Sequence, residues 1–118
     1  MNTEVALAYL LTSPATWSLL AYNINHAMVF RVKTRVLATA VGMLTGRKCA
    51  SMVIGRYLNN EAWLNRLGLS LVERRRGFNR GGIYIIMIVD RARAIRANAR
   101  YAKLLGFTSQ QAVRHTPQ

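Results

Sequence analysis

Between residues 34 and 68 the hydrophobic positions follow a helical repeat. In the first half they recur at steps of three and four, at Leu37, Ala40, Val41 and Leu44. This spacing predicts a helix that is capped by Thr34 and ends at Thr45-Gly46. A further helix is expected from about Ala50 to a left-handed cap at Gly68. Its inward positions are Val53, Ile54, Tyr57, Leu58, Leu64 and Leu67.

The helical repeat fails at Asn59-Asn60-Glu61, where an apolar residue is expected. The second helix therefore either bends there or restarts with Asn60 as its cap. Together with the turn of residues 46 to 49, the two helices are expected to form a helix-turn-helix.

Residues 69 to 89 predict two strands joined by a turn that carries arginines. Ile83 to Val89 is a run of seven apolar residues rich in β-branched types, and Gly81-Gly82 frees the backbone for the turn. Both faces of this second strand are apolar. We therefore expect the helical unit on one face, and the N-terminal helices, the C-terminal helix or a second subunit on the other. A short strand is also expected from Met28 to Val32.

Further helices are expected at both ends of the chain. Residues 3 to 11 fit a helix whose apolar side is Val5, Ala8 and Leu11. Residues 14 to 25 fit a second helix, capped by Ser13, whose apolar positions are Trp17, Leu20, Ala21 and Ile24. Near the C-terminus a helix should begin at an Asp90 cap and end at Gly106. Its predicted apolar side is Ala92, Ile95, Ala99 and Ala102.

The 118 residues have the length of one domain, and the expected elements make it mainly α-helical with a small antiparallel β-hairpin. We divide this single domain into N-terminal helices (residues 1–27), a helix-turn-helix with its strands (28–89), and a basic C-terminal helix and tail (90–118). The first helix adds more apolar surface than one small module can bury. The N-terminal helices are therefore a candidate homodimer contact.

Charge is strongly polarised along the chain. Lys and Arg number 17 against 4 Asp and Glu, which gives a formal net charge of +13, and every basic residue lies at or after Arg31. This excess is larger than solubility requires of a small domain. The expected partner is a polyanion, and the preference for Arg over Lys suits two-point contacts with phosphate.

Catalytic and metal chemistry have little support. Cys49 is the only cysteine, which excludes an internal disulfide and a cysteine-based zinc site and favours an intracellular location, in the cytoplasm or on the nucleoid. The four carboxylates show no spacing typical of an acid–base pair or a hard-metal site. His26 and His115 are isolated. We therefore expect no enzyme activity, no metal and no cofactor.

Residues 5 to 30 carry no charged side chain and are long enough to cross a bilayer. Polar residues within this run, among them Asn23, Asn25 and His26, are unfavourable in a hydrocarbon interior. Two helices of a soluble fold explain the run better, so a membrane partner is not expected. A membrane-anchored DNA-binding protein is kept as a minor alternative.

From about Pro14 to Val89 the chain resembles a winged-helix DNA-binding domain. The resemblance rests on the helix-turn-helix of residues 34 to 67, the junction Leu67-Gly68-Leu69, the basic wing Arg74 to Arg80 and the returning strand that begins Ile83-Tyr84-Ile85-Ile86. It implies a winged helix-turn-helix fold, here with extra helices at both ends. It also implies duplex DNA as the partner, bound by a transcriptional regulator or an architectural protein. The alternative is a structural RNA-binding protein of a ribonucleoprotein, because several ribosomal proteins share this fold and basicity.

The resemblance also assigns roles to residues. In this family the second helix of the motif enters the major groove, which gives the candidates for base contacts as Ser51, Met52, Arg56 and Asn59. The turn before that helix would place phosphate contacts at Arg47 and Lys48. The wing would contribute backbone or minor-groove contacts from Arg74, Arg75, Arg76 and Arg80. Phe78 at its tip would stack on a base or wedge into a base step.

A second set of cations follows one stripe of the C-terminal helix, at Arg93, Arg96, Arg100 and Lys103. Like charges at these spacings repel one another unless an anion is nearby. A phosphate backbone is the simplest such anion, so the four residues join the candidates for nucleic-acid binding. An anionic membrane surface is the weaker choice, because the opposing side is mostly Ala and offers little insertion energy.

Overall fold

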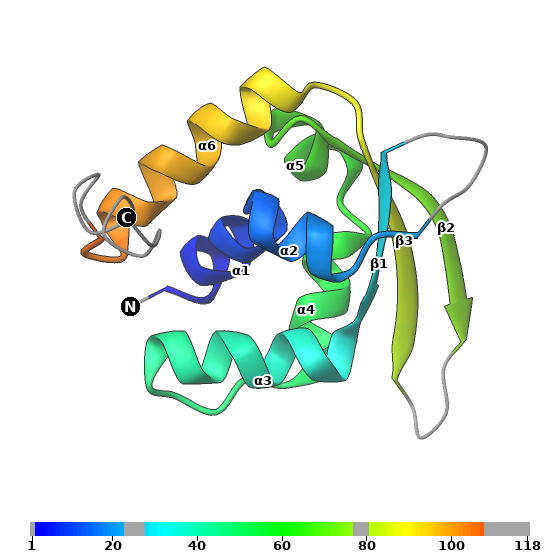
Figure 1. The fold of residues 1–118 in the computed structure, drawn as a ribbon. Helices are drawn as coiled ribbons and strands as arrows, with labels where there is room; N and C mark the ends of the chain where they lie inside the picture. The colour runs from blue at the N-terminus through cyan, green and yellow to red at the C-terminus, as the bar shows by residue number, and fades with distance from the viewer. Residues whose placement is uncertain (1, 23–27, 77–80, 108–118) are drawn as a thin grey trace.

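The computed structural model describes residues 2–22, 28–76 and 81–107, and these contain six helices and a three-stranded antiparallel sheet (Figure 1). In chain order the elements are α1 (Thr3–Leu11), α2 (Pro14–Leu19), β1 (Val29–Lys33), α3 (Thr34–Thr45), α4 (Ser51–Leu58), α5 (Glu61–Arg66), β2 (Leu69–Arg76), β3 (Gly82–Ile88) and α6 (Arg91–Leu104). The described chain is mostly helical. One cluster of buried apolar side chains includes residues from every element.

The sheet has the order β1-β3-β2, so the apolar strand β3 lies in the centre. The predicted hairpin is confirmed, since β2 pairs with β3 from Leu69 opposite Ile88 to Arg76 opposite Gly82. The expected short strand is also present as β1, one residue later than predicted. The register of β2 shifts between Leu71 and Glu73, where Val72 forms a bulge.

The bulge decides which β2 side chains share a face with the core. Tyr84 of β3 is directly opposite Arg74 of β2, and Ile83 is opposite Arg75. Because residues opposite each other in a sheet point to the same side, Arg74 lies on the face of Tyr84 and Arg75 lies on the other face. Tyr84 belongs to the buried core, so the first of these faces is the one that the helices cover.

All of the described helices lie on this one side of the sheet (Figure 1). The expectation that the N-terminal or C-terminal helices would cover the second face of β3 is therefore wrong. Ile85 on that face is nevertheless fully buried, between its cross-strand neighbours Arg31 and Glu73. Long side chains on the two outer strands can shield a central apolar residue without a helical layer.

Helix α1 has the predicted bounds and packs between α6 and α3 (Figure 1). Its buried residues are Ala6, Leu7, Ala8 and Leu11, whereas Val5 is only partly buried, so the predicted apolar side was correct only in part. The apolar surface on which the dimer hypothesis rested is thus covered by the chain's own helices. The homodimer contact itself stays a prediction.

Helix α6 is capped by Asp90, whose side chain accepts from Arg93 N at 3.0 Å, and Gly106 follows its end with φ 89°, both as predicted. The predicted apolar side is wrong, because the helix buries Ala94 and Ala97. Small side chains here permit close approach to α1, and Asn98 Nδ2 donates to Tyr9 O at 2.9 Å. Both series of residues have helical spacing, so the pattern alone does not select between them.

The restart at Asn60 is confirmed. Helix α4 ends at Leu58, and the Asn60 side chain accepts from Trp63 N at 3.1 Å at the start of α5.

The prediction that Thr34 caps α3 is wrong. Lys33 occupies the cap position, and the Thr34 hydroxyl instead accepts a hydrogen bond from Gly82 N at 2.9 Å.

Helix α2 is shorter than predicted and ends at Leu19, because Ala21 instead bridges to Phe30 beside β1. Ser13 occupies the cap position without a side-chain hydrogen bond. The uncharged run of residues 5 to 30 is thereby divided among α1, α2 and β1. No described helix reaches the length and hydrophobicity of a membrane-spanning helix.

Gly68, which ends α5, gives a test of this arrangement. Its φ is 76°, and a Cβ there would overlap the carbonyl oxygen of Asp90. Gly46 has a similar φ of 71°, and a Cβ there would meet no described atom within 4 Å. Gly46→Ala should cost about 1–2 kcal/mol for the left-handed backbone alone, whereas Gly68→Ala should cost about 3 kcal/mol or more. Urea unfolding of both variants measures the difference, and equal losses would contradict the close packing of Gly68 against the start of α6.

Candidate nucleic-acid interface

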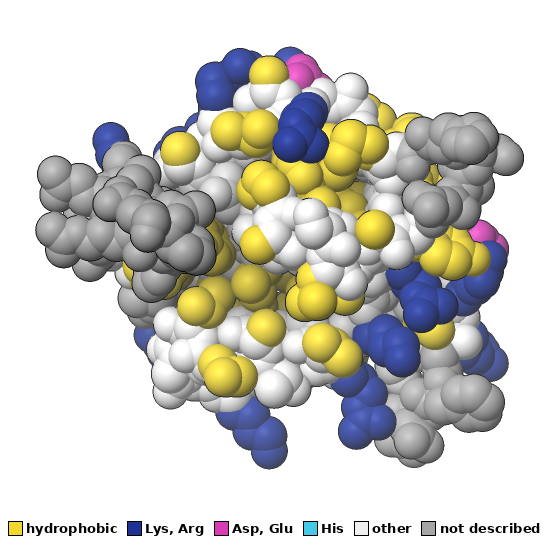
Figure 2. All heavy atoms as spheres, viewed as in Figure 1, with side chains coloured by type: hydrophobic (Ala, Val, Ile, Leu, Met, Phe, Trp, Pro, Cys, Tyr) yellow, Lys and Arg dark blue, Asp and Glu magenta, His cyan; other side chains and the backbone are white. Residues whose placement is uncertain are grey.

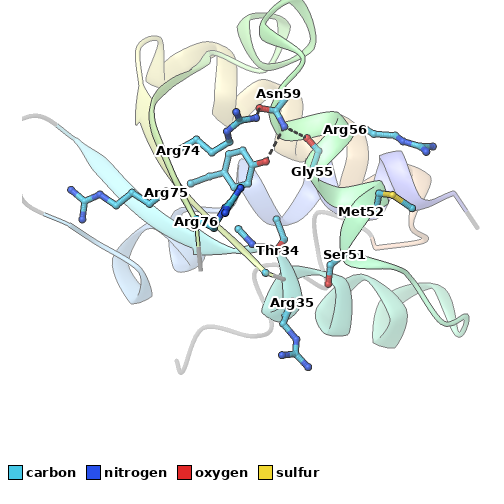
Figure 3. Close-up of a pocket in the computed structure, with 13 residues that line it drawn as sticks. Thr34, Arg35, Ser51, Met52, Gly55, Arg56, Asn59, Arg74, Arg75 and Arg76 are labelled. Atoms are coloured by element: carbon cyan, nitrogen blue, oxygen red, sulfur yellow. Dashed lines mark hydrogen bonds between the residues drawn. The ribbon is translucent and has the colours of Figure 1, made fainter. Parts of the chain in front are cut away.

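An open groove of about 1040 Å³ lies between α4, the start of α3 and the β2–β3 hairpin (Figure 3). The predicted site residues that line it are Ser51, Met52, Arg56, Asn59, Arg74, Arg75 and Arg76. Its other lining residues, which were not predicted, are Thr34, Arg35, Gly55, Gly81, Gly82 and Tyr84. Five arginines line this groove, and no Asp or Glu does. The structure thus brings the predicted helix and wing residues together in one cationic groove.

The short amphipathic repeat of α4 determines what this helix presents to the groove. Ile54 and Leu58 are fully buried one turn apart and fix α4 on the core. The opposite side is exposed, and Met52 has 68% of its surface accessible. Arg56 extends outward from this side, and Arg35 extends outward from the start of α3 (Figure 3). These two guanidinium groups form the rim of the groove.

Asn59 joins three elements of the groove through its side-chain amide. Its Oδ1 accepts from Arg74 Nη1 at 3.0 Å, and its Nδ2 donates to Gly55 O at 2.7 Å and to Tyr84 Oη at 2.8 Å (Figure 3). Both amide hydrogens are therefore already directed to partners. Recognition of adenine requires Asn to donate and accept at once, so the structure does not support the predicted base contact. Asn59 instead holds α4 against β2 and β3.

A second tether fixes the end of the hairpin to α3. The hydroxyl of Thr34, which is buried, accepts from Gly82 N at 2.9 Å. Any Cβ at Gly82 would come within 2.9 Å of the Tyr84 ring. One sequence feature could have indicated a polar contact here, because Tyr84 places a hydroxyl within an otherwise aliphatic strand. It offered no local signal for Arg35, whose importance comes from the position of α3.

Arg75 differs from its two neighbours. It lies on the outer face of the sheet, where its guanidinium donates two hydrogen bonds of 3.0 Å to the Glu73 carboxylate. The hydrogen bond from Arg75 lowers the pKa of Glu73, and the same bond raises the pKa of Arg75. The Arg75 side chain points away from Asn59 and Arg74 (Figure 3). The three arginines predicted to act as one wing set are thus divided between two faces, and Arg74 and Arg76 lie on the groove face.

Other predicted residues lie elsewhere or outside the described chain. Arg47 and Lys48 are exposed in the turn before α4 and line a separate hollow of about 630 Å³, together with Asn2 and Thr3. Phe78 and Arg80 are not among the described residues. His26 and His115 also lie outside them.

The basic residues of α6 are not brought into the groove. None of the predicted stripe lines it, and Arg93 is held by its own neighbours, with Nη1 donating to Asn65 O at 3.3 Å and Nε 3.6 Å from Asp90. Arg100 lies over the Tyr101 ring at 5.0 Å. The α6 stripe, defined as Arg93, Arg96, Arg100 and Lys103, is therefore a surface of its own.

The described residues provide no group of three His, Cys, Asp or Glu side chains that could hold a metal ion. The thiol of Cys49 is partly buried, and this burial raises its pKa, which disfavours the reactive thiolate. The guanidinium groups of the groove can bind anions.

Comparison of the chain with protein-family models, with curated proteins and with solved structures gave no significant match. Geometry and charge therefore carry the functional interpretation.

The tether made by Asn59 has a measurable contribution to stability. Asn59→Ala removes three hydrogen bonds and leaves the hydroxyl of buried Tyr84 without this partner, so the free energy of unfolding should fall by about 1–2 kcal/mol. Asn65→Ala is the matched control, because Asn65 is exposed in α5 and its side chain makes no hydrogen bond to the described residues. Its substitution should change the free energy by less than about 0.5 kcal/mol. Similar values for the two variants in urea unfolding would show that the tether contributes nothing.

Proposed function

We propose that the protein binds duplex DNA in the manner of a winged-helix domain, with α4 and the β2–β3 hairpin on either side of the contact. One observation carries this proposal: four arginines that line the groove, Arg35, Arg56, Arg74 and Arg76, form no ion pair with a described carboxylate, whereas the guanidinium of Arg75 is turned to Glu73. A guanidinium group makes two-point contacts with phosphate oxygens, and cations gathered without counter-charge favour a polyanionic partner.

The arrangement of the elements supports the winged-helix interpretation. Strand β1, helices α3 and α4, and the hairpin β2–β3 follow one another in the order that the resemblance implies, apart from the short α5. The central position of β3 brings the hairpin beside α4. The exposed side of α4 and the basic hairpin therefore face the same groove.

The shape favours DNA over structured RNA. The major groove of B-form DNA is about 12 Å wide and admits an α-helix, whereas the major groove of A-form RNA is deep and narrow. Helix α4 has eight residues, which corresponds to a length of about 12 Å, and it presents an exposed side. Such a helix can enter a B-form groove while Arg74 and Arg76 contact the adjoining phosphates.

Phosphate contacts should dominate this binding. With the amide of Asn59 engaged inside the protein, Arg56 is the remaining α4 side chain with a strong two-point match to a base, guanine. Ser51 and Met52 discriminate weakly between bases. Of the two predicted roles, we therefore favour an architectural protein that coats DNA over a highly selective transcriptional regulator.

The proposal is tested by measuring affinity for a duplex against salt concentration. If Arg35, Arg56, Arg74 and Arg76 each neutralise one phosphate, log affinity should fall with log salt at a slope of about −3.6. Arg76→Ala should reduce the slope by about 0.9. Arg75→Ala is the control. It removes the same charge one residue away from Arg76, but Glu73 holds the Arg75 side chain on the other face of the sheet. Its effect on the slope should be clearly smaller.

Two outcomes would contradict the proposal. An affinity that does not change with salt would show that phosphate contacts do not drive binding. Equal effects of Arg75→Ala and Arg76→Ala on the slope would show that the groove is not the binding surface. Competition with a folded RNA at matched salt addresses the ribonucleoprotein alternative. The duplex should remain bound, whereas displacement by the RNA would favour that alternative.

A further inference from the structure

The α6 stripe lies on the exposed part of α6, and Arg93 at its start also contacts Asn65 of α5. Helix α6 packs against α1 and buries Ala94 and Ala97 in the core. With 3.6 residues per turn, the centre of the stripe lies roughly 110° around the helix from the midpoint of Ala94 and Ala97. Arg96, Arg100 and Lys103 are all exposed. These cations therefore point outward from the edge of the helical layer.

Little negative charge compensates the stripe. Helix α6 contains no Asp or Glu, and among the described residues the carboxylate that pairs with the stripe is Asp90, which lies beside Arg93. Arg96 precedes Arg100 by four residues, and Lys103 follows Arg100 by three, so these like charges repel one another across one or two turns. An anion bound along the stripe would relieve this repulsion.

Beyond Arg93, which contacts α5, the stripe is separated from the groove by the body of the protein. Helices α6 and α3 lie on opposite sides of α1, and the groove borders the start of α3 (Figure 1). Two helix-packing distances of about 8–10 Å each exceed the Debye length of about 8 Å at physiological salt. Figure 2 shows Lys and Arg side chains over α6 and others near the strands, with a mostly uncharged surface between them. The two cationic surfaces therefore act independently.

A single short duplex cannot reach both surfaces. DNA has a persistence length of about 150 base pairs, so a duplex of about 20 base pairs behaves as a stiff rod. Once such a rod lies in the groove, the stripe at the far edge of the helical layer stays free. We infer that the α6 stripe binds the phosphate backbone of a second DNA segment, so that one molecule bridges two duplexes. This inference rests on the proposed function of the groove.

The bridge is tested by a capture experiment. A 20-base-pair duplex is immobilised, the protein is bound to it, and a second fluorescent 20-base-pair duplex is added. The wild-type protein should retain the second duplex. The variant Arg96→Gln/Arg100→Gln/Lys103→Gln should still bind the first duplex within about twofold, but retention of the second should fall about tenfold or more. The substituted residues are exposed and Gln is a good helix former, so the variant should fold.

A variant that keeps the charge of the stripe shows whether charge is what binds the second duplex. Arg96→Lys/Arg100→Lys keeps every positive charge of the stripe and should retain the second duplex. Its failure to do so would overturn the electrostatic basis of the bridge. Retention of the second duplex by the triple Gln variant at the wild-type level would also overturn the inference, because capture would then arise from two grooves of an assembled pair of molecules.

Failure of the bridge can be told apart from failure of the groove. If the immobilised duplex retains no wild-type protein, the proposed function itself is wrong. If the protein is retained but the second duplex is not, the groove proposal stands and the α6 inference falls.

Discussion

The side-chain amide of Asn59 holds α4 against the β2–β3 hairpin, and the candidate interface depends on this contact. Its three hydrogen bonds reach the backbone of α4, a guanidinium of β2 and a hydroxyl of β3. An exposed helix of eight residues and a two-stranded hairpin are each weak units on their own. Tied together, they form one surface whose cations keep a fixed spacing. For the proposed binding of a rigid duplex, such preorganisation lowers the entropic cost.

The bulge at Val72 sets the chemistry of that surface. Shifting a strand register by one residue exchanges its two faces. In the observed register Arg74 and Arg76 lie on the groove face, and Arg75 lies on the outer face with Glu73. Without the bulge, β2 would direct a different set of its side chains to the groove. The distribution of charge in the interface therefore follows from one backbone irregularity as well as from the number of arginines.

Local sequence signals predicted most of the elements. Asn60 as a cap, Gly68 as a left-handed stop and the β-branched run of β3 each depend on the preferences of a few neighbouring residues, and the structure confirms all three. Tertiary context decided the rest. Two stripes of α6 have the same helical spacing, and only the packing of the helix on the core selects the buried one, which holds Ala94 and Ala97.

Local sequence signals also predicted part of the groove, and tertiary context decided the rest. The basic residues of α4 and β2 stand out in the sequence, but their assignment to faces does not, because it depends on the bulge and on partners distant in the chain. Thr34 meets Gly82 across 48 positions, and Asn59 meets Tyr84 across 25. A residue that reads as a helix cap or a base contact can thus serve as a tether. The spacing of its basic residues predicted the α6 stripe. That the stripe lies apart from the groove became apparent only from the structure.

The most direct test is to map backbone amide chemical shifts while a 16-base-pair duplex is added to one equivalent. The largest changes should occur along α4 and in β2 at Arg74 and Arg76, and the amide of Gly82 at the base of the hairpin should change with them. If the chemical shifts of the groove amides do not change while those of another surface do, the proposed assignment of this groove as the DNA-binding surface is contradicted.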